Sequence, residues 1–115
     1  MTNFVVVISK GPFHGDEAEW PLRFVDLALE GGHKVQVFLA EDAIWIAKKG
    51  QQYDVHPNLE EYIKNAVKKG AEIKVCETCR KRRNLSEKDY LPGLAKGTMT
   101  EFIEAAAKAD KVLTF

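Results

Sequence analysis

One stretch of the sequence decides the fold: PNLEEYIKNAVKKGAEIKVC, residues 57–76. Apolar side chains recur in it at the three- and four-residue spacing of one helix face. Pro57 predicts the start of this helix and Gly70 its end. The β-branched residues after Gly70 then indicate a strand that runs directly into Cys76. The residues of the helix face are Leu59, Tyr62, Ile63, Ala66 and Val67.

Strands and helices alternate on both sides of this stretch. FVVVI, residues 4–8, is a continuous apolar run that favours a strand buried on both faces. Alternation of this kind predicts an α/β fold, a three-layer α/β/α sandwich around a mostly parallel sheet of five strands, formed by one domain spanning residues 1–115. The other predicted strands are residues 35–39, 73–75, 94–97 and 112–115, and the other predicted helices are residues 22–29, 42–49 and 102–109.

The composition excludes several classes of protein. Hydrophobic residues make up 45% of the chain, enough for a core that needs no disulfide or metal. The net charge is zero, with 17 basic and 17 acidic residues, so no overall field favours nucleic acid. No apolar run approaches the ~20 residues of a membrane helix, and the first residues lack the basic region of a signal peptide. We therefore expect a cytoplasmic protein that binds neither membranes nor nucleic acid.

The clearest chemical feature is the pair Cys76-x-x-Cys79. Function in parallel sheets collects at the carboxyl ends of strands, and Cys76 lies at such an end. The basic segment that follows predicts a helix start, where unpaired amides and nearby arginines such as Arg82 and Arg83 favour a thiolate. A thiolate is the attacking form in nucleophilic and sulfur-transfer chemistry. The same spacing also suits a reversible disulfide, so a redox pair stays open.

Other readings of the pair are less well supported. A lone cysteine after a strand often serves as a small buried hydrophobe. A structural zinc site needs about four ligands, and the three histidines are far apart in sequence, so no metal is predicted. The basic run at residues 80–83 is balanced by nearby acidic residues, which indicates a solvated helix face.

The loop after the first strand contains Gly11, His14 and Gly15. A doubly wound fold places ligand loops here, but the Gly-x-Gly-x-x-Gly fingerprint is missing, so no dinucleotide or other cofactor is predicted. His14 titrates near neutrality and suits proton exchange with a thiol or persulfide at the same sheet edge. A loop histidine without a role is the alternative.

Several segments together resemble the DsrE/DsrF-like family, which includes the TusD-type subunits of the sulfur relay that feeds tRNA thiolation. The similar segments are VVISKGP at residues 6–12, LALEGGHKVQVF at residues 27–38 and ADKVLTF at residues 109–115. Cys76, with Arg82 and Arg83 six and seven residues on, is similar to the cysteine loop of the family. Two features depart from it: Asn84 stands where TusD-type subunits have glycine, although asparagine tolerates a left-handed turn, and Cys79 is a second thiol.

The resemblance implies a flavodoxin-like sandwich, a homo- or hetero-oligomer of trimeric or hexameric form, with a homo-oligomer expected here, and a cysteine that carries sulfane sulfur as a persulfide. Other sulfur-carrier proteins are then possible partners. Carried over to this chain, Cys76 accepts and passes on sulfur, as in a sulfurtransferase. A thiol–disulfide oxidoreductase or redox sensor using both cysteines, or a non-catalytic oligomer subunit, are the alternatives. Self-association is also expected because large apolar residues lie outside the periodic core faces: Trp20, Trp45, Ile46 and Tyr53.

Overall fold

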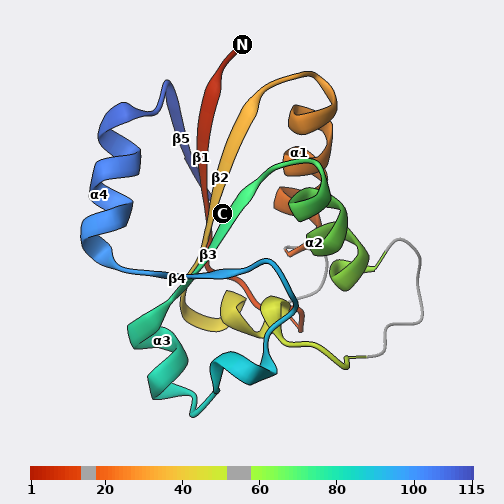
Figure 1. Ribbon diagram of the computed structural model, residues 1–115, viewed down its shortest axis with the longest axis vertical. Coiled ribbons are helices and arrows are strands. Elements are labelled where there is room, and N and C mark those ends of the chain that lie inside the picture. Colours follow the sequence, from red (N-terminus) through yellow and green to blue (C-terminus); the bar gives the residue numbers. More distant parts are fainter. Residues whose placement is uncertain (14–17, 52–57) are drawn as a thin grey trace.

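The computed structural model describes residues 1–13, 18–51 and 58–115. Strands and helices alternate along it (Figure 1), as predicted. Their bounds are β1 Asn3–Ile8, α1 Glu19–Glu30, β2 Lys34–Leu39, the 3₁₀ helix η2 Glu41–Ala47, α2 Leu59–Lys68, β3 Glu72–Cys76, α3 Glu77–Arg82, the 3₁₀ helix η3 Glu87–Asp89, β4 Ala95–Gly97, α4 Met99–Lys108 and β5 Lys111–Thr114.

The five strands form one sheet in the order β4-β3-β2-β1-β5, and every pairing within it is parallel. Parallel neighbours require crossover connections, which the helices between them provide. All strands therefore end at the same edge of the sheet, where η2 and α3 lie (Figure 1). The predicted α/β fold with a mostly parallel five-stranded sheet is confirmed.

Helices cover the two faces of the sheet unequally. The helices α1 and α2 lie against one face and α4 against the other (Figure 1). The buried core fills the first side, where side chains of β2 meet those of α1, α2 and η2. On the second side no residue of α4 is fully buried. The contacts of this helix include Phe38 meeting Phe102 edge-on at 5.2 Å and Lys74 paired with Glu101 at 2.6 Å.

The helix α2 begins differently from the prediction. Its N-cap is Asn58, whose side chain accepts the Glu61 amide at 2.9 Å, while the Glu61 carboxylate accepts the Asn58 amide at 3.3 Å. This capping box satisfies two amides at the helix start. Pro57, the predicted start, lies outside the described residues. The predicted end is confirmed, because Gly70 has φ +98°, a value that favours glycine.

The predicted helix at residues 42–49 is the 3₁₀ helix η2, and its predicted exposed face is wrong. Ile46 is only 1% exposed and Trp45 is half-buried. The reason is that α2, α3, β2 and β3 all pack around this short segment, while Leu91 donates its amide to the Ala47 carbonyl. Of the other predicted exposed residues, Trp20 is 71% exposed and Tyr53 lies outside the described residues.

Candidate functional site

Cys76 is the last residue of β3 and the N-cap of α3, as the sequence predicts. Its Sγ atom accepts the Cys79 amide, with 3.4 Å between sulfur and nitrogen. The residue is half-buried, and its partner on the edge strand β4 is Gly97, which has no side chain. A thiol in this position is held by the backbone of its own helix and remains partly open to solvent.

Cys79 lies one helical turn further on and is buried, with 9% of the residue exposed. Its Sγ atom accepts the amide of Glu41, the first residue of η2, at 3.1 Å. Glu41 has φ +51°, a left-handed conformation that is unfavourable for residues other than glycine, asparagine and aspartate. Both cysteines are free thiols. The two sulfur atoms therefore lie in different surroundings, one partly open and one enclosed.

Asp42 connects the loops at this edge. Its carboxylate Oδ1 accepts hydrogen bonds from Nε and Nη2 of Arg83, at 3.0 and 2.9 Å. Arg83 Nη1 donates a further hydrogen bond to the Cys79 carbonyl at 3.2 Å. On its other side, the Asp42 backbone packs against Gly11, where an added Cβ would lie 2.8 Å from the Asp42 carbonyl oxygen. We call Glu41, Asp42, Arg83 and Gly11 the Cys79 clamp, because together they fix the backbone around that sulfur.

These contacts bear on two predicted roles. Gly11 is a buried packing position beside Asp42, which the absence of a Cβ makes possible, instead of an open ligand loop. The Arg83 guanidinium is directed to Asp42, while Arg82 is exposed and makes no hydrogen bond or ion pair within the described chain. His14 and Gly15, the other predicted loop residues, lie outside the described residues.

The predicted thiolate at Cys76 stays a prediction, and the direction of the pKa shift does not favour it. Burial raises the pKa of the Cys76 thiol, a hydrogen bond with the Cys79 side chain raises it further, and the Cys79 amide lowers it by less. The arginines do not reverse this direction, because Arg80 pairs with Glu77 and Arg83 pairs with Asp42. A cation already held by a carboxylate stabilises a neighbouring thiolate less than a free cation does.

The comparisons with known proteins agree with the fold described above. The model of the DsrE/DsrF-like family matches residues 2–115. The chain belongs to the DsrE/DsrF-like family. It is similar to an uncharacterized protein of Methanopyrus kandleri, with 39% identity over 110 residues, covering 96% of this chain and 91% of that protein. It is also similar to YchN of Escherichia coli, with 27% identity over 114 residues, covering 96% and 97% of the two chains. The crystal structure of YchN superposes with a TM-score of 0.93 at 26% identity over all of both chains.

Family membership confirms the resemblance and the fold that it implied. Asn84 of this DsrE/DsrF-like chain has φ +55°, so asparagine takes the left-handed turn that glycine would otherwise provide. In the parts of the chain that the structure describes, no group of three or more histidine, cysteine or acidic side chains is placed to hold a metal ion. No described helix is both long and apolar enough to cross a membrane.

Glu41 and Asp42 belong to the site of this DsrE/DsrF-like chain, although the sequence does not predict them. They are two adjacent acidic residues at the start of a predicted helix, a pattern that occurs in many proteins. Only the spatial meeting of the loops after β1 and β2 with α3 reveals their role. The signal that was available is position, since both residues follow a strand end.

The pKa direction predicts the reactivity of the Cys76 thiol. Because burial favours the protonated form, labelling of Cys76 by iodoacetamide should rise with pH and reach half its maximum above the free-thiol pKa of ~8.5. Peptide mass spectrometry after short pulses measures labelling at each cysteine separately. The chain unfolded in urea is the control, and its midpoint should fall near the free-thiol value. A folded-state midpoint below that of the unfolded chain would contradict the assigned direction.

Proposed function

We propose that this protein accepts sulfane sulfur at Cys76 as a persulfide and delivers it to an acceptor. The observation that carries the proposal is the placement of a half-buried thiol at the end of β3, in a member of the DsrE/DsrF-like family. A persulfide carrier needs a sulfur that a donor can reach and that the backbone holds in place. Cys76 meets both requirements, while Cys79 is enclosed.

The transfer step is a thiol exchange on a sulfane sulfur atom. The Cys76 thiol loses its proton, the sulfur attacks the outer sulfur of a donor persulfide R–S–SH, and the donor leaves as R–SH, so that Cys76 carries –S–SH. The Cys79 amide, 3.4 Å from Cys76 Sγ, stabilises negative charge on the attacking sulfur. Because burial raises the pKa of this thiol, the rate of loading should increase with pH above neutrality.

The same two thiols support a second candidate function, a thiol–disulfide oxidoreductase or redox sensor. The observation that favours it is the placement of the two thiols one helical turn apart at the start of α3, where the Cys79 amide donates to Cys76 Sγ at 3.4 Å. In this function a Cys76–Cys79 disulfide forms with an external oxidant and no sulfur is carried.

Intact mass spectrometry distinguishes the two functions. The reduced protein is mixed with a small-molecule persulfide donor, and samples are alkylated at intervals from seconds to minutes. Sulfur carriage predicts an early species heavier by one sulfur atom, which disappears when Cys76 is alkylated before mixing. A redox pair predicts loss of two hydrogen atoms with no species that gained sulfur at any time.

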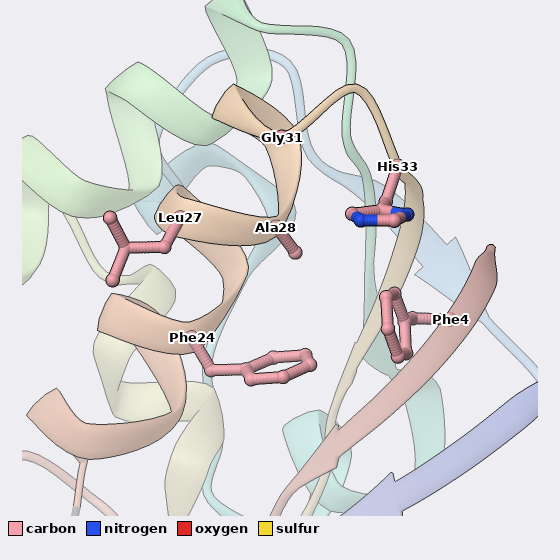
Figure 2. Close-up of a pocket in the computed structure, with 6 residues that line it drawn as sticks. All are labelled: Phe4, Phe24, Leu27, Ala28, Gly31 and His33. Atoms are coloured by element: carbon pink, nitrogen blue, oxygen red, sulfur yellow. The ribbon is translucent and has the colours of Figure 1, made fainter. Parts of the chain in front are cut away.

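We further propose that the protein is a cytoplasmic homo-oligomer, a trimer or hexamer, that exchanges sulfur with other carrier proteins. The support for self-association is an apolar strip on α1, where Trp20 is 71% and Leu27 61% exposed. Phe24 lies between them and lines two adjoining hollows of about 320 and 310 Å³. Figure 2 shows residues that line the second hollow, where the Phe4 ring meets Phe24 edge-on on one side and His33 edge-on on the other. The cytoplasm suits the two free thiols, because it keeps cysteines reduced.

Trp20→Glu should dissociate the oligomer if the α1 strip forms the contact, because an exposed carboxylate would be buried without a partner. Sedimentation velocity over a dilution series measures the mass against the 13.0 kDa of one chain. Lys81→Glu is a matched control that places a carboxylate at another exposed helix position. A single 13.0 kDa species for the unmodified protein at micromolar concentration would refute self-association.

A further inference from the structure

Proposed sulfur carriage uses only Cys76, and it leaves the Cys79 clamp without a role. The clamp is nevertheless the most constrained part of the site. The strained left-handed Glu41 directs its amide to Cys79 Sγ at 3.1 Å, and Arg83 joins the Asp42 carboxylate to the Cys79 carbonyl. Strain of this kind persists only where the surrounding contacts over-determine the backbone, and it is concentrated at functional sites.

The clamp acts on the Cys79 sulfur in two ways. The Glu41 amide, which donates to the Cys79 Sγ atom at 3.1 Å, fixes the position of this sulfur. Arg83 also links the Cys79 carbonyl to the carboxylate of Asp42, the residue next to Glu41. This link keeps the Cys79 sulfur and the Glu41 amide from moving apart. Cys79 is thus an oriented, enclosed nucleophile beside the open thiol of Cys76.

We propose that Cys79 is a resolving thiol, and that Arg83 is the positioning residue that holds it ready to attack a persulfide on Cys76. This inference rests on the proposed function and names the fate of the sulfur. The Cys79 thiol loses its proton and attacks the inner sulfur of the persulfide. The bond between the two sulfurs of the persulfide breaks, and the outer sulfur leaves with the proton as hydrogen sulfide: Cys76–S–SH + Cys79–SH gives Cys76–S–S–Cys79 + H₂S.

The electrons in this step balance within the protein. The sulfane sulfur is reduced to sulfide, and the two cysteines are oxidised to one disulfide. A second cycle therefore requires a dithiol reductant, such as a small-molecule dithiol or a dithiol protein, which returns the pair to thiols. The substrate class is a persulfide or polysulfide, and the sulfur that Cys76 accepts leaves the cysteine pair as sulfide, which is the form delivered to the acceptor.

The experiment separates loading from release. Unmodified protein, Cys79→Ser, Arg83→Gln and the control Lys81→Gln are mixed with a small-molecule persulfide donor in single-turnover amounts. Lys81 is exposed and lies on the same helix, so its variant removes one positive charge without touching the clamp. Intact mass after alkylation measures sulfur on Cys76, and a sulfide probe measures release. Thermal melting of each variant records its stability.

The unmodified protein and Lys81→Gln should release one sulfide for each disulfide formed. Cys79→Ser should load sulfur and hold it. Arg83→Gln should slow release roughly tenfold to a hundredfold more than it slows loading, because a displaced nucleophile loses reactive alignment. Equal slowing of loading and release in Arg83→Gln would indicate a general structural role and overturn the inference. Sulfur held by the unmodified protein without sulfide release overturns the inference and leaves the proposed function standing, whereas no loading in Cys79→Ser overturns both.

Discussion

Cys76→Ser should lose all sulfur loading, while Cys79→Ser should keep it. Serine matches the size of cysteine, but its oxygen cannot form a persulfide, so the expected loss is complete. Cys79 is 9% exposed and its Sγ atom is engaged by the Glu41 amide, so a donor reaches Cys76 first. Intact mass after mixing with a persulfide donor and alkylation measures the difference. The two serine variants serve as matched controls for each other, because both remove one thiol from the same helix start.

Two other loading results of the serine variants would contradict the proposal that Cys76 is the sulfur acceptor. If Cys79→Ser fails to load and Cys76→Ser gains sulfur, the enclosed thiol is the acceptor, and the accessibility argument is wrong. If both single variants fail, sulfur gain requires the pair together. Cys76 would then not be a sufficient acceptor, and the proposal that it loads sulfur by itself would be wrong.

The second large effect is expected at Gly11, where alanine should lower the free energy of unfolding by about 1–3 kcal/mol, the usual cost of overpacking. The reason is steric, since the new Cβ would lie 2.8 Å from the Asp42 carbonyl oxygen and 3.3 Å from the Asp42 Cβ, both on rigid parts of the clamp. Because the clamp moves with Asp42, sulfide release should slow as well. Urea unfolding gives the stability, from the midpoint at constant slope.

Gly31→Ala is the matched control for this substitution. The added Cβ there would meet the ring of His33 at 3.2 Å, and Gly31 has φ −76°, which alanine adopts freely. A side-chain ring can shift by a few tenths of an ångström where a backbone carbonyl cannot, so the loss of stability should be smaller than at Gly11. Equal stability of the unmodified protein and Gly11→Ala would show that the clamp is looser than the structure indicates.

The alternation of strands and helices could be predicted because it depends on local patterns. The run FVVVI at residues 4–8 reads as a buried strand, and the periodic face of residues 59–67 reads as a helix, and both are observed. The position of Cys76 follows from the same patterns, since a strand end and a helix start meet there. Asn84 could be predicted as a left-handed turn because asparagine tolerates positive φ.

The chemistry around the thiols could not be predicted in the same way, because it depends on which side chains meet in space. The sequence indicates a basic helix beside Cys76, but Arg83 points to Asp42, a residue 41 positions earlier, and Arg80 pairs with Glu77. Burial is the largest cause of the raised pKa of the Cys76 thiol. The sequence likewise predicts Ile46 outside the core, although it is buried, because an unbroken apolar run does not show that neighbours pack on all its sides.

The most direct test of the central claim is the location of the sulfur atom. The protein is loaded with isotopically labelled sulfane sulfur from a small-molecule persulfide donor, alkylated within seconds, digested and analysed by tandem mass spectrometry. The account predicts the labelled sulfur on Cys76 as an alkylated persulfide, at early times in the unmodified protein and stably in Cys79→Ser. Labelled sulfur on Cys79, or a Cys76–Cys79 disulfide that forms with no labelled sulfide released, would contradict it.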